Sequence, residues 1–490
     1  MLWSAGERRM DGLKRLFAEH FGIVAEEARP LKGELGGSGR RIVRLTGGGH
    51  SAIGILYPVR AENRAFVEFS RHFRRHGLAV PEIYGEDLEA GAYLEEDLGD
   101  TTLFEFLGTH RTGESIAPKA MEAYRKVVAE LPRFQVGAGR DLDYRLCTPR
   151  ASFDRQSIAW DLNYFKYYFL RLAGVEFSEQ ALEDDFNRLT DFLLSAPRDY
   201  FLYRDFQSRN VMLRDGKPYF LDYQGGRKGA LQYDIASLLF DAKADLPPAM
   251  RAELLEYYLD CLAELIPVDR AAFIEHYYAY VYVRIFQAMG AYGFRGFYER
   301  KAHFLESVPF ALKNLRWLRE NAKLPVELPE LMRALERMAA SEKLQGLRTS
   351  AGPLKVAEPL RVRIFSFSFH RQMPADESGN GGGFVFDARS LPNPGREERF
   401  RSMTGKDAEV IDYLNREASV HRYFAHVTSL VDASVEEYRR RGFKNLMVSF
   451  GCTGGQHRSV YLAEQLARHL RGVSGVEAVV RHIEQEKASR

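Results

Sequence analysis

The chain has 490 residues, a length at which one hydrophobic core usually divides into two or three domains. Hydrophobic residues make up 45% and charged residues 28%, a balance that excludes a disordered or fibrous chain. The net charge of +2 gives no global attraction to nucleic acid, although a local basic patch is compatible with it.

The number and spacing of the cysteines, and the lengths of the apolar segments, predict the cellular compartment of the protein. Cys147, Cys261 and Cys452 are far apart and odd in number, so neither a disulfide framework nor a zinc-ligand spacing can be built from them. The N-terminus lacks the apolar core of a signal peptide, and no run of about 18 apolar residues is present. We therefore expect a cytoplasmic protein with no membrane partner.

Periodicity predicts a compact first part and then a mostly helical region from about 102 to 340. An amphipathic helix at 7–20 precedes a β-β-β-α-β-β order, and the aromatic stretch 276–294 is typical of a packed core helix. The elements expected in the first part are strands at 26–34, 40–46 and 51–56, a helix at 60–76, and strands at 81–88 and 92–97.

Residues 341–358 have no periodic apolar pattern and a cluster of Pro and Gly, which predicts a linker. A new α/β unit is expected after it, so the predicted units are 1–98, 99–340 and 359–490. The elements expected in the last unit are strands at 361–369 and 445–450 and helices near 407–418, 434–441 and 457–470.

Three polar residues have a spacing that suits phosphoryl transfer. Asp205 and Asn210 form an Asp-x4-Asn pair, and Asp222 follows after a turn at Asp215-Gly216. Phosphoryl transfer requires a carboxylate at the acceptor hydroxyl and oxygen ligands for Mg²⁺ on the phosphates. Taken singly, each of these residues is as well explained as a turn residue. The ordered set favours a kinase.

The stretch Tyr203 to Asn210 reads YRDFQSRN and resembles the H-R-D-x-x-x-R-N loop of the aminoglycoside phosphotransferase and choline kinase superfamily. Within it, the sequence is most similar to the sugar kinases of cell-wall recycling, which phosphorylate N-acetylmuramate and N-acetylglucosamine at the anomeric carbon. The resemblance implies an α+β, protein-kinase-like bilobal fold and ATP or GTP as donor. It also implies Asp205 as the base, Asn210 and Asp222 as Mg²⁺ ligands, and Asp234 as a brace of the loop.

By the same resemblance, two further segments bind the nucleotide. A glycine-rich loop between two strands would cradle the phosphates, and the segment 95–99 would form the hinge that meets the purine. The nucleotide-binding residues expected are Gly36, Gly37, Ser38, Gly39, Arg40, Arg41, Glu95, Glu96 and Asp97.

The sequence departs from the family at two places. Tyr203 stands where the family has His, and the strand 51–55 lacks the lysine that most kinases use to grip the phosphates. Lys32, Arg40 and Arg41 are the candidate substitutes. Two alternatives stay open: an antibiotic- or choline-type phosphotransferase, and a non-catalytic kinase-like regulator that binds RNA or a phosphosugar.

A glycine-rich turn follows an apolar strand near the C-terminus and opens a helix, which is a natural anion site. The residues expected in this anion pocket are Cys452, Thr453, Gly454, Gly455, Gln456, His457, Arg458 and Ser459. The spacing Cys452-x5-Arg458 alone also fits the cysteine phosphatase signature. The alternative without a ligand or a reaction is a buried structural cysteine beside a tight turn.

The fuller string from Gly451 to Ser459, with the motifs at 386–394 and 403–405, resembles the C-terminal domain of the RNase adapter RapZ over about residues 360–490. In that family the domain binds glucosamine-6-phosphate and regulatory RNA. The resemblance implies a regulatory domain for a phosphosugar or a nucleotide, with His370, Arg389 and Asn393 as further contributors. RNA is not the expected partner, because residues 480–487 mix charge signs and favour a solvated helix face.

Overall fold

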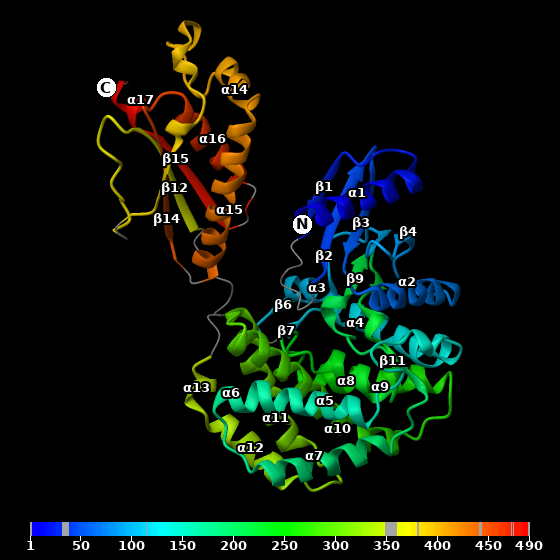
Figure 1. The fold of residues 1–490 in the computed structure, drawn as a ribbon. Helices are drawn as coiled ribbons and strands as arrows, with labels where there is room; N and C mark the ends of the chain where they lie inside the picture. The colour runs from blue at the N-terminus through cyan, green and yellow to red at the C-terminus, as the bar shows by residue number, and fades with distance from the viewer. Residues whose placement is uncertain are drawn as a thin grey trace. The chain divides into compact units, whose positions relative to one another are not determined.

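The structure is a computed structural model that describes residues 2–31, 39–113, 115–347, 360–379, 382–440, 443–471, 473 and 475–488. The chain forms two compact units, residues 1–349 and 350–490 (Figure 1). Within the described helices, none has the length and hydropathy needed to cross a bilayer.

The first unit begins with a five-stranded antiparallel sheet in the order β1-β2-β3-β5-β4 (Figure 1). Helix α1 (Leu2–Phe21) packs on one face and α2 (Arg60–Arg75) on the other, because successive residues of each strand point to opposite faces. The β-β-β-α-β-β prediction is confirmed. The strands are β1 (Glu27–Pro30), β2 (Arg41–Gly47), β3 (His50–Leu56), β4 (Ile83–Asp87) and β5 (Ala92–Glu96).

The rest of this unit is mainly helical and packs around α10 (Arg270–Gly293), the predicted core helix. Three antiparallel strand pairs lie among the helices in the described part of this unit: β6 (Arg111–Thr112) with β7 (Ser115–Ile116), β8 (Tyr200–Leu202) with β11 (Arg227–Gly229), and β9 (Val211–Arg214) with β10 (Lys217–Phe220). Other helices are α3 (Leu103–Thr109), α4 (Pro118–Pro132), α5 (Arg155–Tyr164), α7 (Glu179–Leu194), α8 (Gln232–Leu239), α9 (Pro248–Ala263), α11 (Val308–Asn321) and α12 (Pro329–Ala340).

The start of the predicted linker is corrected. Residues Glu342–Gln345 form a short helix, α13, which packs on the first unit. Leu344 is buried in the core of that unit, and Lys343 Nζ donates to the carbonyl of Leu172 at 3.1 Å. Residues 348–359 lie outside the described part of the chain.

The second unit has a parallel sheet in the order β13-β14-β12-β15, which confirms a smaller α/β domain. Its strands are β12 (Leu360–Ser368), β13 (Phe384–Asp387), β14 (Asn445–Cys452) and β15 (Val476–His482). Its helices are α14 (Ala408–Asn415), α15 (Ala418–Arg440), α16 (Arg458–Arg471) and α17 (Ile483–Ala488).

Two predictions in this unit are corrected in part. The helix near 434–441 is the end of α15, which has 23 residues. Residues 480–482 belong to β15, which pairs with β12, whereas residues 483–487 lie in the helix α17. His482 is buried, with Nδ1 2.8 Å from Ser366 Oγ and Nε2 3.0 Å from Glu464 Oε1.

Candidate active site

The loop after β8 carries Asp205 and is held by Asp234 on α8. The carboxylate of Asp234 accepts the backbone N–H of Tyr203 at 2.8 Å and that of Arg204 at 3.0 Å. Arg204 has a φ of 83°, in the left-handed region. Burial raises the pKa of Asp234 to about 7. These contacts match the bracing role that the resemblance implies.

The structure brings Asp205, Asn210 and Asp222 together. Asn210 Nδ2 donates to the carbonyl oxygen of Asp205 at 2.8 Å and to Asp222 Oδ2 at 3.1 Å. The backbone N–H of Leu221 donates to the carbonyl of Asn210 at 2.9 Å, which continues the β9–β10 pairing by one step and places Asp222 beside Asn210. Asp222 has a φ of 66°, so a local turn aims its side chain at the loop.

The carboxylate of Asp222 lies in an environment that suits a cation. Burial, and then the negative charge of Asp205, raise the pKa of Asp222 to about 6. Gln224 Nε2 donates to Asp222 Oδ1 at 2.6 Å. Two carboxylates and an amide at one half-buried point offer the oxygen ligands that Mg²⁺ prefers, and an added cation would relieve the repulsion between the carboxylates.

Arg40 supplies a positive charge in front of these carboxylates. Its Nη2 lies 2.6 Å from Glu62 Oε2 in the first turn of α2, and its Nη1 lies 3.5 Å from Asp222 Oδ1. The usual lysine strand, β3, instead places Ile53 and Ile55 in the core on the α2 side. The cation therefore comes from the residue before β2.

The other loop residues are placed differently. Arg41 is exposed, and strand alternation puts it on the face of Val43 and Leu45, which pack under α1. Arg40 and Arg41 thus point to opposite faces. Gly39 is exposed, while Gly36, Gly37, Ser38 and Lys32 lie outside the described residues.

A cavity of about 650 Å³ lies at the predicted hinge. Asp97 lines it and accepts hydrogen bonds from Ser51 Oγ at 2.5 Å and Arg44 Nη2 at 2.9 Å. Although burial alone would raise the pKa of Asp97, these two bonds lower it. The lining residues are Arg44, Ser51, Asp97, Leu98, Gly99, Asp100, Thr101, Leu213, Arg214 and Asp215.

The two glutamates of the predicted hinge do not line this cavity. Glu95 is 7% exposed, its Oε2 has no hydrogen-bond partner among the described residues, and burial raises its pKa to about 8. Glu96 accepts from Arg214 Nη1 at 2.7 Å. Of Glu95, Glu96 and Asp97, the hinge residues expected to bind the nucleotide, Asp97 is the one that lines the cavity.

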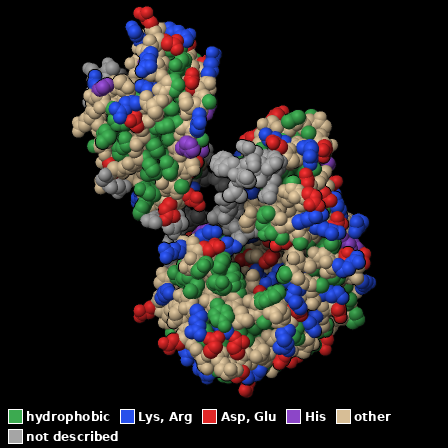
Figure 2. Space-filling model, in the orientation of Figure 1, with side chains coloured by type: hydrophobic (Ala, Val, Ile, Leu, Met, Phe, Trp, Pro, Cys, Tyr) green, Lys and Arg blue, Asp and Glu red, His purple; other side chains and the backbone are tan. Residues whose placement is uncertain are grey.

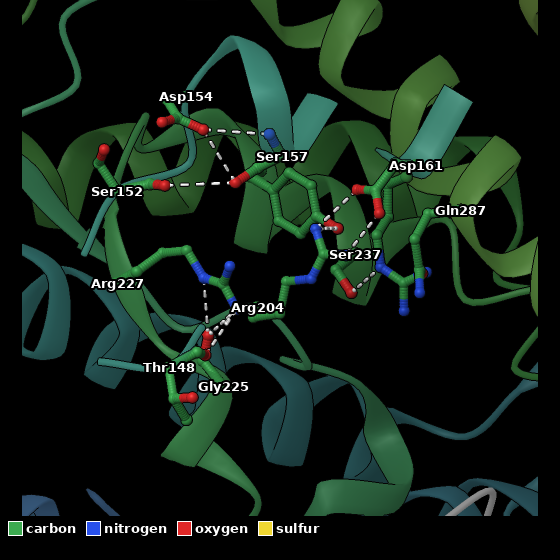
Figure 3. A network of polar contacts seen from close by, with 12 residues as sticks. Thr148, Ser152, Asp154, Ser157, Asp161, Arg204, Gly225, Arg227, Ser237 and Gln287 are labelled. Carbon is green, nitrogen blue, oxygen red and sulfur yellow. Dashed lines mark hydrogen bonds and ion pairs between the residues drawn. The ribbon is translucent and has the colours of Figure 1, made fainter. Parts of the chain in front are cut away.

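A buried ion pair holds Arg204, the residue before Asp205, against helix α5 (Figure 3). Arg204 Nη1 and Nη2 each donate to the carboxylate of Asp161 on α5 at 2.7 Å, and Nη1 also donates to the Tyr233 hydroxyl at 2.8 Å. Sequence reasoning missed both Asp161 and Glu62. An acidic residue in the first turn of the helix after β3 is a signal for Glu62, whereas no spacing marks Asp161.

The predicted anion pocket of the second unit lies between β14 and α16. Cys452 is buried, with its Sγ 3.2 Å from Ser459 Oγ. The side chains of Gln456 and His457 turn away from the exposed Thr453 and Gly454: Gln456 Nε2 donates to the Met403 carbonyl at 2.6 Å, and His457 Nε2 lies 2.8 Å from the Phe400 carbonyl. These two side chains fix the neighbouring loop.

Arg458 is the notable charge of this pocket. It is 4% exposed, and its Nη1 donates to the carbonyls of Arg389 and Leu391, both at 2.9 Å. Its Nη2 donates to Thr453 Oγ1 at 3.2 Å, and its Nε has no hydrogen-bond partner among the residues that the structure describes. Arg389 itself is paired with Asp387, and Asn393 Oδ1 accepts from the backbone of Gly395.

A five-stranded sheet with a hinge, followed by a helical part that holds an Asp-x4-Asn loop and a second Asp, defines a protein-kinase-like phosphotransferase fold. Residues 34–268 match the model of the phosphotransferase enzyme family, and residues 360–486 match that of the RapZ C-terminal domain. The chain therefore carries a phosphotransferase domain followed by a RapZ C-terminal domain. The predicted resemblance to the phosphotransferase family, the predicted resemblance to the RapZ C-terminal domain and the predicted enzyme class are confirmed.

Two curated nucleotide-binding proteins each match 26% of this chain. Nucleotide-binding protein XCV3122 of Xanthomonas euvesicatoria pv. vesicatoria (strain 85-10) is 45% identical over 127 residues, which is 26% of this chain and 43% of that protein. A nucleotide-binding protein of Xylella fastidiosa (strain M23) is 40% identical over 130 residues, again 26% of this chain and 43% of that protein. The chain spans less than half the length of these relatives.

Two solved structures each match nearly two thirds of this chain. Aminoglycoside phosphotransferase APH(4)-Ia is 14% identical with a TM-score of 0.42, covering 64% of this chain and 100% of that one. Choline kinase LicA from Streptococcus pneumoniae is 15% identical with a TM-score of 0.41, covering 63% of this chain and 99% of that one.

Proposed function

We propose that the first unit transfers the γ-phosphoryl group of ATP or GTP to a hydroxyl of a sugar, and that this sugar is an amino sugar of the cell-wall recycling type. The observation that carries the proposal is the bridge that Asn210 makes between Asp205 and Asp222, opposite the Arg40–Glu62 pair. It gathers a base, oxygen ligands for a metal and a phosphate-directed cation at one point.

Asp205 is the group that would accept the proton of the attacking hydroxyl. Its backbone is fixed by Asn210, and the preceding residues are fixed by Asp234 and Asp161. Rigid placement is the main contribution that a protein makes to phosphoryl transfer, because the reacting oxygen must lie in line with the leaving group.

Asn210 and Asp222 would hold Mg²⁺, which would neutralise the charge that builds up on the phosphates. Arg40 would bind a phosphate oxygen from the other side of the cleft, in place of the lysine that β3 lacks. The cavity at Asp97 would receive the purine and ribose. The glycine-rich segment 36–39 remains a predicted phosphate loop.

The acceptor is tested by measuring transfer from ATP and from GTP, with Mg²⁺, to a panel of sugars. The panel contains N-acetylmuramate, N-acetylglucosamine, glucosamine, choline and an aminoglycoside. Turnover on an N-acetylated amino sugar is expected. Turnover only on the aminoglycoside or on choline would transfer the assignment to those phosphotransferase classes.

A second proposal concerns the second unit: it binds a phosphosugar or nucleotide phosphate at the turn 453–457 and regulates the kinase. It is carried by Arg458, a buried cation that, among the described residues, donates hydrogen bonds to two carbonyls and a hydroxyl and keeps its Nε without a hydrogen-bond partner. Asp387 attracts Arg458 but is itself paired with Arg389, and an anion at the start of α16 would add a direct counter-charge to the buried guanidinium. Phosphatase chemistry is disfavoured because Cys452 is buried against Ser459.

RNA is not the partner we propose for this unit. On the face shown in Figure 2, basic and acidic side chains are interspersed over the described residues, without a broad basic surface. Binding to nucleic acid depends on clustered cations and weakens steeply with salt. A gel shift with that salt dependence would support the alternative of an RNA-binding regulator.

A further inference from the structure

Two histidines and an aspartate converge at the C-terminal end of α2. His72 lies in the last turn of the helix and His76 is its C-cap, four residues later, so their rings face the same side and their centroids are 4.6 Å apart. Asp141, directly after the 3₁₀ turn Ala138–Arg140, faces both rings. His76 Nε2 lies 3.0 Å and His72 Nε2 3.6 Å from the same oxygen, Asp141 Oδ1.

These distances suit one metal ion. In tetrahedral zinc sites the nitrogen and oxygen ligands lie at about 2.0–2.2 Å, which puts neighbouring ligand atoms about 3.3 Å apart. The three potential ligand atoms all lie within 4.8 Å of one another, and the two measured pairs bracket that value. The carbonyl oxygen of Ala138 accepts a hydrogen bond from His72 Nε2 at 2.8 Å, so the ion would take the place of that proton.

The ligand chemistry selects the kind of metal. Imidazole nitrogens bind zinc, nickel and copper, whereas Mg²⁺ prefers oxygen ligands only. A ligating imidazole must give up the proton on its coordinating nitrogen.

We propose that His72, His76 and Asp141 form a binding site for a divalent transition metal of the zinc class, separate from the magnesium site of the cleft. The ion would clamp the end of α2 to the turn Ala138–Arg140. That turn packs against β8, since a methyl group on Gly139 would lie 2.7 Å from Phe201 Cβ. The clamp would thus join the helix that carries Glu62 to the strand that leads to Asp205. The proposal does not depend on the phosphotransferase activity.

The test is calorimetric titration of the untagged full chain with Zn²⁺ in excess Mg²⁺, so that the cleft is filled with Mg²⁺. One equivalent of Zn²⁺ is expected to bind the wild-type chain, and its affinity is expected to fall roughly 100-fold or more in His76→Ala and in Asp141→Asn. His50→Ala, which removes an exposed histidine at the start of β3, is the matched control and should bind like wild type.

Co²⁺ provides a second measurement that does not depend on heat signals. The wild-type chain should give the intense visible bands of tetrahedral Co²⁺, and His76→Ala should lose them while keeping its far-UV circular dichroism. Absence of Zn²⁺ binding by the wild-type chain would overturn the proposal. So would full binding by both variants, or binding that is lost in Asp222→Asn instead.

Discussion

Arg40 Nη2 lies 2.6 Å from Glu62 Oε2, and Arg40 Nη1 lies 3.5 Å from Asp222 Oδ1. One guanidinium thus joins the first turn of α2 to the predicted metal ligand. A kinase normally uses a lysine of its third strand for the pair with this helix. Here β3 contributes only apolar side chains at the core positions, and the cation comes from the residue before β2.

Arg40→Ala should therefore impair phosphoryl transfer strongly. Loss of one preorganised hydrogen-bond donor that stabilises charge in the transition state lowers a rate by about 10²–10³-fold, and we expect a fall of that size in kcat. Steady-state kinetics with ATP as the varied substrate measures the effect. Glu62→Gln should have a smaller effect, because it releases the guanidinium without removing it.

Arg41→Ala is the matched control, because Arg41 is the adjacent arginine on the opposite face of the sheet. It should keep kcat and the KM for ATP within about threefold of wild type, since an exposed charge in water interacts weakly. Equal loss of activity in both arginine variants would contradict the assignment to Arg40.

Asp161→Asn should destabilise the first unit. The change leaves the buried guanidinium of Arg204 without its bidentate counter-charge, and breaking such a pair costs about 3–5 kcal/mol. Urea unfolding followed by tryptophan fluorescence measures it. Asp191→Asn breaks an exposed pair with Arg155 and should change the free energy of unfolding by less than about 1 kcal/mol. Similar losses in the two variants would refute a special role for Asp161.

Glu95 predicts a pH dependence of stability. Burial raises its pKa in the folded chain to about 8, so between the unfolded value of 4.5 and about pH 8 the folded state retains a proton that the unfolded state has lost. The stability that this group contributes is full below pH 4.5 and falls as the pH rises to 8. Glu95→Gln removes the titration. The variant should gain about 1–3 kcal/mol relative to wild type between pH 5 and pH 8.

Denaturant unfolding of wild type and Glu95→Gln across that pH range makes the comparison. A constant difference in stability from pH 5 to pH 8 would show that Glu95 is ionised in the folded chain. The assignment of a neutral carboxyl group at the inner end of the hinge would then be wrong.

Arg458→Gln should weaken phosphosugar binding by the second unit. Removal of the buried cation takes away the counter-charge of the phosphate, and we expect affinity for glucosamine-6-phosphate to fall at least about tenfold in calorimetric titration. Arg468→Gln, an exposed change on the same helix, should bind like wild type. A circular dichroism spectrum checks that the Arg458 variant is folded, and unchanged affinity in a folded variant would exclude this pocket.

Local periodicity predicted most elements of the first unit, because its strands each have one face toward α1 or α2. It also predicted the Asp205, Asn210 and Asp222 cluster, because a short loop and a two-residue turn leave few other arrangements. It did not predict β15. The residues of β15 mix charge signs, and their strand conformation is imposed by pairing with β12, more than a hundred residues earlier in the chain.

Long-range pairing also explains the missed site residues. Asp161 is one of several acidic residues on helical segments. Its contact with Arg204, the residue before Asp205, distinguishes it from the others (Figure 3). The choice between Arg40 and Arg41 depends on strand register, which the sequence alone left open. Once β2 begins at Arg41, alternation gives the two side chains opposite faces.

The central claim is phosphoryl transfer with Asp205 as base, and its most direct test is the rate of transfer from ATP to N-acetylmuramate and N-acetylglucosamine in Mg²⁺. Wild type should turn over at least one of the two sugars, and Asp205→Asn should lower kcat by about 10²–10⁴. Asp199→Asn, an exposed change just before β8, should retain the wild-type rate. Equal rates in wild type and Asp205→Asn, or no transfer to either sugar by a chain that binds ATP, would contradict the account.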